Sequence, residues 1–154
     1  MAGLQFGTAM RDITPRHPVW AHGYASRSRP SSGVREALSL GCLAVSDGQK
    51  RVLMFSLDMV GVRADICDDL YALLEKETGV AYPNIMISGS HTHFAPALQG
   101  TASADPAHER VEPDLAYVAH FKKRMVEAAQ EALAGLRPRR LEVARIRAPQ
   151  VGFN

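Results

Sequence analysis

Apolar and polar residues alternate along several segments of the chain, and this alternation predicts β-strands over residues 4–13, 37–46, 51–57, 84–88 and 141–146. Elsewhere apolar residues recur at helical spacing, which predicts helices over residues 63–78 and 113–133. Gly79 and Gly135 follow these two stretches and are natural helix terminators. Asp47 and Gly48 predict a tight hairpin turn between neighbouring strands.

The pattern also indicates which residues the elements bury. The first strand is expected to have one half-buried face, and its two faces carry Leu4, Phe6, Thr8 and Met10 on one side and Gly7, Ala9 and Arg11 on the other. The long helix has an apolar stripe, formed by Leu115, Val118, Phe121, Met125 and Ala132.

Strands separated by helices favour an α/β fold, a mixed β-sheet with helices packed on it. A chain of 154 residues is long enough for one domain with a hydrophobic core, so we treat residues 1–154 as one unit. Ligands of such sheets bind at the carboxyl ends of strands. The residues that follow each predicted strand are therefore the first candidates for function.

Composition narrows the function classes. Hydrophobic residues make up 46% and charged residues 22% of the chain, as in a globular protein. The net charge of +2 by itself does not indicate nucleic-acid binding. Cys42 and Cys67 form neither a disulfide framework nor a four-cysteine zinc site. With no apolar leader or membrane-spanning run in view, we expect a cytoplasmic protein without a transmembrane segment.

The most informative stretch is residues 84–96, where an apolar strand runs into Ser88, Gly89 and Ser90 and then reaches His91 and His93. If the extended geometry continues through Thr92, the two imidazoles point to the same side. Such a pair is half of a metal site, or a metal ligand next to a general acid–base. The alternative is an ordinary pair of surface histidines.

Two further places offer partners for this pair. Asp58 follows a strand directly and could lie at the same end of the sheet as the histidines. It could also simply cap the turn or helix that comes next. His22 and Tyr24 lie in a long loop rich in Pro, Gly, Ser and Arg, and a loop of that length is often functional or mobile. There they would line a pocket, or form a turn with a packed tyrosine.

These motifs, taken in order, resemble the N-terminal portion of the neutral/alkaline (non-lysosomal) ceramidase family. The matching segments are Phe6-Gly7-Thr8-Ala9, Asp12-Ile13-Thr14-Pro15, His22-Gly23-Tyr24, the turn at Asp58, and the stretch from Asn84 to Pro96. The chain departs from the family's Ser-Gly-Pro-Gly at Phe94-Ala95-Pro96-Ala97, which places a bulky ring where a small residue lets substrate approach. It also has Ala37-Leu38-Ser39 where the family tends to show Ala-Arg-Ala.

The resemblance implies a zinc-dependent hydrolase of N-acyl amide bonds that acts on ceramide, a sphingolipid, or on a related lipid-like amide. It assigns His91 to zinc and His93 to the active site near the scissile amide. We add Asp58 as a second catalytic candidate, and His22 and Tyr24 as substrate-pocket residues. The family is typically secreted or membrane-facing, which is the alternative to a cytoplasmic location.

The resemblance also implies that the other zinc ligands, a second His, a Glu and a Tyr, lie beyond the position that matches Asn154. We therefore expect the chain to be the first part of a larger catalytic domain and to be inactive alone. Two alternatives remain: a non-catalytic α/β binding or interaction module, and an enzyme completed by another chain. An incomplete sheet would leave an open edge or apolar face, so we expect a homo-oligomer.

Overall fold

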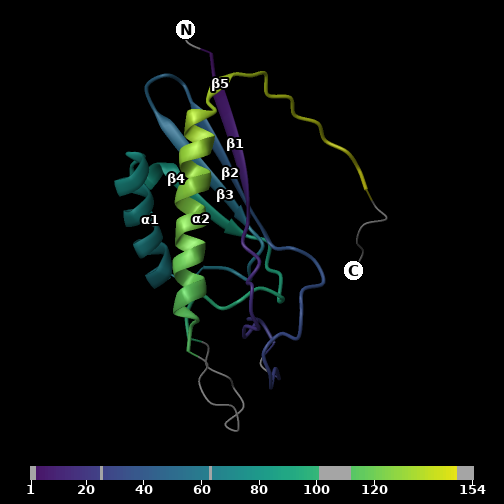
Figure 1. Ribbon diagram of the computed structural model, residues 1–154. Coiled ribbons are helices and arrows are strands. Elements are labelled where there is room, and N and C mark those ends of the chain that lie inside the picture. The colour runs from purple at the N-terminus through teal and green to yellow at the C-terminus, as the bar shows by residue number, and fades with distance from the viewer. Residues whose placement is uncertain (1–2, 25, 63, 101–111, 149–154) are drawn as a thin grey trace.

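The computed structural model describes residues 3–24, 26–62, 64–100 and 112–148 (Figure 1). Its centre is a sheet in the order β4-β3-β2-β1-β5, in which only β3 and β4 run parallel. The strands are β1 (Gln5–Asp12), β2 (Ser39–Ser46), β3 (Arg51–Leu57), β4 (Ile85–Gly89) and β5 (Arg137–Pro138). With α1 (Ala64–Thr78) and α2 (Leu115–Ala134) packed on it, the sheet confirms the predicted mixed α/β fold.

The hairpin and helix ends lie where the sequence predicts them. Asp47 and Gly48 connect β2 to β3, and the Asp47 carboxylate accepts hydrogen bonds from the backbone N–H groups of Gln49 and Lys50. Gly79 follows α1 with a positive φ of 66°, which a glycine adopts without strain. A short 3₁₀ helix, η1 (Tyr82–Asn84), then leads into β4. Local turn chemistry is therefore sufficient to place these boundaries.

The first strand buries the face that carries its small residues. Gly7 and Ala9 lie against α2, whereas Thr8 and Met10 on the opposite face are exposed. A Cβ atom on Gly7 would lie 1.9 Å from the backbone oxygen of Ala132, so the helix packs directly on the strand backbone. Large side chains on this face would keep α2 away from the sheet.

The stripe predicted for α2 is largely correct, with one exception. Phe121, Met125 and Ala132 are buried, but Leu115 is 75% exposed in the first turn. Tyr117 occupies the buried position instead, and its hydroxyl donates a hydrogen bond of 2.9 Å to the backbone oxygen of Ile13. Leu115 directly follows the N-cap Asp114, where the helix has just begun.

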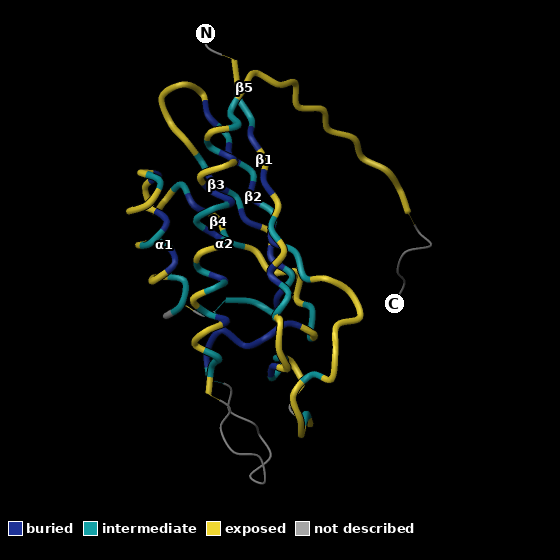
Figure 2. Tube along the Cα trace, in the orientation of Figure 1, coloured by how far each residue is buried: buried dark blue, intermediate teal, exposed yellow. Residues whose placement is uncertain are grey.

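The prediction of a strand over residues 141–146 is wrong. These residues are exposed and form no regular structure, and the chain leaves the body of the molecule there (Figures 1 and 2). The fifth strand is the short β5, which pairs with Gln5 and Phe6 of β1. Alternation alone does not make a strand, because each strand needs a neighbouring edge for its backbone hydrogen bonds.

The two faces of the sheet are unequal. The face toward the helices carries the hydrophobic core, whereas the opposite face has side chains that are only half-buried or exposed. We call this opposite face the open sheet face, and define it by Phe6, Met10, Leu43, Val45, Val52, Met54 and Met86. Met10 and Met86 are 69% and 48% exposed. Over the described residues, this face is therefore mostly apolar, apart from Thr8, Ser56 and Ser88, and is little covered.

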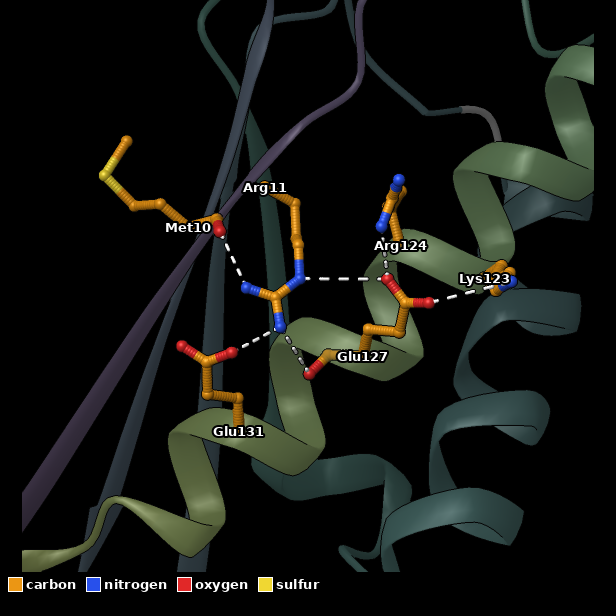
Figure 3. A network of polar contacts seen from close by, with 6 residues as sticks. All are labelled: Met10, Arg11, Lys123, Arg124, Glu127 and Glu131. Carbon is orange, nitrogen blue, oxygen red and sulfur yellow. Dashed lines mark hydrogen bonds and ion pairs between the residues drawn. The ribbon is translucent and has the colours of Figure 1, made fainter.

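A network of charged groups joins β1 to α2 (Figure 3). The Arg11 guanidinium pairs with the carboxylates of Glu131 and Glu127, and Arg124 donates a hydrogen bond of 2.7 Å to Glu127. This bond, followed by the charges of Arg124, Lys123 and Arg11, lowers the pKa of Glu127. The network therefore links β1 to α2.

No helix in the described part of the chain is long and apolar enough to cross a membrane.

Candidate functional site

The two histidines lie at the carboxyl end of β4, as expected, but their geometry is not that of a strand. The strand ends at Gly89, and His91 adopts a left-handed conformation with φ of 65°. The backbone N–H groups of Ser90 and His91 bond to the carbonyl oxygens of Leu57 and Met59, both at 2.8 Å. The extended geometry through Thr92 on which the parallel orientation of the rings depended is therefore not formed, because the chain turns back over the end of β3.

The imidazole rings nevertheless meet. The ring centroids of His91 and His93 are 5.0 Å apart, with an angle of 65° between the ring planes. The left-handed turn at His91, rather than the alternation of a strand, brings the two rings together. The pair predicted from the sequence thus exists, for a different physical reason.

One ring nitrogen of His91 is already committed. Its Nδ1 atom lies 2.7 Å from the backbone oxygen of Val60. A carbonyl oxygen only accepts, so Nδ1 must carry the hydrogen, and in the neutral ring Nε2 then keeps its lone pair. Metal-binding histidines commonly donate their second ring nitrogen to a backbone carbonyl in this way. Because His91 is exposed, its Nε2 atom is chemically suited to bind a metal ion.

His93 is held by the loop that carries His22 and Tyr24. The Tyr24 ring meets the His93 ring edge-on at a centroid distance of 4.9 Å. A Cβ atom on Gly23, which has φ of 109°, would lie 2.3 Å from Cγ of His93. Only glycine provides both the backbone angle and the space for the ring at this position.

His22 joins the same cluster. Its backbone N–H donates a hydrogen bond of 2.8 Å to the oxygen of Ala95, next to a β-bridge between Ala21 and Pro96. Burial is the main cause that lowers the pKa of His22, and the neighbouring His93 and His91 lower it further. The structure therefore gathers His22, Tyr24, His91 and His93, although they lie in two segments that are distant in the sequence.

Asp58 positions the turn rather than capping the segment after it. Its Oδ2 atom accepts hydrogen bonds from the backbone N–H and the hydroxyl of Ser39, at 2.9 and 2.6 Å. The Asp58 N–H in turn donates to the Ser39 oxygen at 2.9 Å. The Ser39 hydroxyl, and after it the Ser39 N–H and the Ser90 hydroxyl, lower the pKa of Asp58. Asp58 thus remains ionised and connects β2 to the residue before His91.

A cavity of about 780 Å³ opens beside this cluster, between the loop over residues 14–38 and the segment that carries Thr92 and Phe94. Asp58 lies in its wall, together with Arg27, Val19 and Leu38. His22 and Tyr24, which we predicted to line a pocket, are not part of this wall and contact the histidines instead. The volume is in the range of small-molecule sites.

Within the described residues, no group of three or more His, Cys, Asp or Glu side chains is arranged to hold a metal ion. Zinc sites need three or four donors. The donor chemistry therefore fits one zinc ligand, His91, and does not fit a complete site formed by the described residues. Residues 101–111, which follow the histidine segment, lie outside the described residues.

Sequence reasoning missed three residues of this region. Ser39 holds Asp58, the Ser90 hydroxyl lies near the same carboxylate and lowers its pKa, and Arg27 donates a hydrogen bond of 3.0 Å to the backbone oxygen of His93. Ser39 and Arg27 act on residues 19 and 66 positions away in the chain. No local motif signals such partners, because only the fold brings them together.

No family model matches the sequence, and no curated protein matches it. The fold, in contrast, is similar to solved structures. The crystal structure of neutral ceramidase from Pseudomonas aeruginosa matches with a TM-score of 0.71 and 19% sequence identity over 90% of this chain. A ceramidase structure in complex with C2 matches with the same values. The chain spans 22% of the length of either ceramidase chain. The predicted resemblance is therefore confirmed for the fold.

Proposed function

We propose that this chain contributes part of the active site of a zinc-dependent hydrolase that cleaves N-acyl amide bonds, of ceramide or of a related amide, with His91 as a zinc ligand. The observation that carries the proposal is the hydrogen bond from His91 Nδ1 to Val60, which leaves Nε2 free at the carboxyl end of β4. The fold shared with neutral ceramidase supports it.

Zinc, when bound, polarises an amide carbonyl and lowers the pKa of a bound water to about 7. The residues of this chain have separate tasks around it. The Val60 carbonyl orients the His91 ring. His93, held between Gly23 and Tyr24, would donate a hydrogen bond to the oxygen of the amide as negative charge develops there. Asp58 positions the turn through Ser39 and Ser90.

The proposal requires zinc ligands from outside the described residues, because one or two histidines bind zinc only weakly. These ligands would come from residues that the structure does not describe or from another chain. If they lie beyond these 154 residues, the chain assayed by itself will show no appreciable N-acyl amidase turnover. Robust turnover by this chain alone would contradict that expectation.

The test compares His91→Ala with His120→Ala in the longest available form of the protein. His120 lies on α2, far along the chain from the histidine pair, and serves as the matched control. We expect His91→Ala to abolish stoichiometric zinc binding and amide hydrolysis, and His120→Ala to change neither. If the protein is a non-catalytic binding module, zinc content and ligand binding will be the same in both variants.

A further inference from the structure

Arg27 lies against two aromatic rings, Tyr24 and Phe94, which also contact each other beside the histidine pair. Its Cζ atom lies 5.5 Å from the centroid of the Tyr24 ring and 6.0 Å from that of Phe94, distances typical of cation–π contacts. Its Nη2 atom donates a hydrogen bond of 3.0 Å to the backbone oxygen of His93. Arg27 is also part of the cavity wall. Its position is therefore fixed relative to both the cavity and His93.

The charge of Arg27 has no anionic partner among the described residues. Its bond to the His93 carbonyl is the only hydrogen bond that the guanidinium makes there, and its buried Nε atom has no acceptor. In contrast, Arg11 and Arg124 both pair with glutamates of α2. The Nε atom of Arg124 also has no acceptor within the described residues, but the charge of that guanidinium is paired with Glu127. Partly buried cations are normally paired, so Arg27 is the one of these three that calls for an anionic ligand.

The other charged groups at the cavity do not neutralise Arg27. The Asp58 carboxylate is occupied by Ser39. The imidazole of His17, which also lies in the wall, pairs with the carboxylate of Asp114 at the start of α2. Apolar side chains, among them Val19, Leu38 and Phe94, form much of the remaining wall. Arg16, Arg35 and Glu36 also lie in the wall, but all three are exposed, and Glu36 forms no ion pair with Arg27. The cavity thus combines a half-buried guanidinium, without an anionic partner in the described part of the chain, with a partly apolar surface.

We propose that this cavity binds N-acyl amino acids, with the carboxylate held by Arg27 and the acyl chain against Val19, Leu38 and Phe94. A guanidinium fork matches the planar geometry of a carboxylate. In an N-acyl amino acid only one carbon separates the amide nitrogen from the carboxylate. The bond from Arg27 to His93 would therefore place the scissile amide near the histidine pair.

This proposal names the substrate class of the proposed hydrolase and rests on that function for the cleavage step alone. Binding can be measured without zinc and without turnover. We suggest calorimetric titration of the protein with N-octanoylglycine and with its uncharged methyl ester. The variants are Arg27→Gln and, as a matched control, Arg29→Gln, which removes an exposed arginine of the same loop that is not part of the cavity wall.

We expect the wild-type protein and Arg29→Gln to bind the acid roughly ten- to a hundred-fold more tightly than the ester, as a charge-assisted bidentate contact implies. Arg27→Gln should bind both compounds within about three-fold of each other, close to wild-type affinity for the ester. Equal affinity of the wild-type protein for acid and ester, or no detectable binding of either, would overturn the proposal. A preference for the acid that survives in Arg27→Gln would do the same.

A second measurement applies if Arg27→Gln does not fold. Raising sodium chloride from about 0.05 to 0.5 M should weaken binding of the acid to the wild-type protein and leave the ester unaffected, because salt screens only the charged contact. Equal salt dependence of the two compounds contradicts the proposal. Hydrolysis of neutral ceramide without any preference for the acid would keep the proposed function and reject the carboxylate site.

Discussion

The carboxylate of Asp58 accepts two hydrogen bonds from Ser39, one from the backbone N–H at 2.9 Å and one from the hydroxyl at 2.6 Å. These bonds join the start of β2 to the end of β3, directly beneath the turn that carries His91. Its place at a strand end makes Asp58 a catalytic candidate. Its contacts are those of a group that positions the turn. The catalytic role of Asp58 stays a prediction.

Ser39→Ala should destabilise the protein mainly at neutral pH. The folded state holds the pKa of Asp58 below its ordinary value of 3.8, so the bond contributes stability above that value and loses it as pH falls through the lower, folded pKa. We expect a loss of about 1 kcal/mol near pH 7. Urea unfolding at neutral pH and at about pH 2.5 checks this, and a difference that grows in acid would contradict it.

Gly23→Ala should displace the ring of His93. The new methyl group would lie 2.3 Å from Cγ of His93, and φ of 109° is strained for any residue with a side chain. We expect a loss of about 2 kcal/mol and a shift of the His93 imidazole signals in NMR spectra. Gly33→Ala in the same loop is the control, because its added methyl group would meet no atom within 4 Å. Unchanged His93 signals in Gly23→Ala would refute the contact.

Gly7→Ala tests the packing of α2 on β1. The methyl group would lie 1.9 Å from the backbone oxygen of Ala132, and a helix backbone cannot yield there without moving as a whole. Overpacking of this kind costs about 1 to 3 kcal/mol. The urea midpoint should fall accordingly. Gly3→Ala, which meets nothing within 4 Å, should leave it unchanged.

The open sheet face should drive association of a second copy of the chain. Met10 and Met86 are 69% and 48% exposed on a face whose other side chains are mostly apolar, and such a surface favours burial between copies. Light scattering of Met86→Lys and Met10→Lys should show less self-association than the wild-type chain. Leu115→Lys, which changes an exposed leucine at the start of α2, is the control. A monomeric wild-type chain would contradict the expectation.

Most element boundaries depend on local pattern. The strands near residues 5–12, 39–46, 51–57 and 85–89, the Asp47–Gly48 turn and the helix ends at Gly79 and Gly135 all lie close to their predicted places. Each depends on neighbours within a few residues, and these are visible in the sequence. The strand predicted over residues 141–146 failed because its existence depends on a partner edge, which a sequence pattern does not reveal.

For the candidate site too, the sequence reveals the residues but not their arrangement. By itself the sequence determined which chemistry is present: two histidines after an apolar strand, an aspartate after another, and a loop with His22 and Tyr24. Only the tertiary structure decided their arrangement. The left-handed turn at His91, the bond from Nδ1 to Val60, the contact of His93 with Gly23 and the unpaired charge of Arg27 all depend on segments distant in sequence. Chain folding brings these segments together through core packing, and side-chain chemistry alone does not encode that packing.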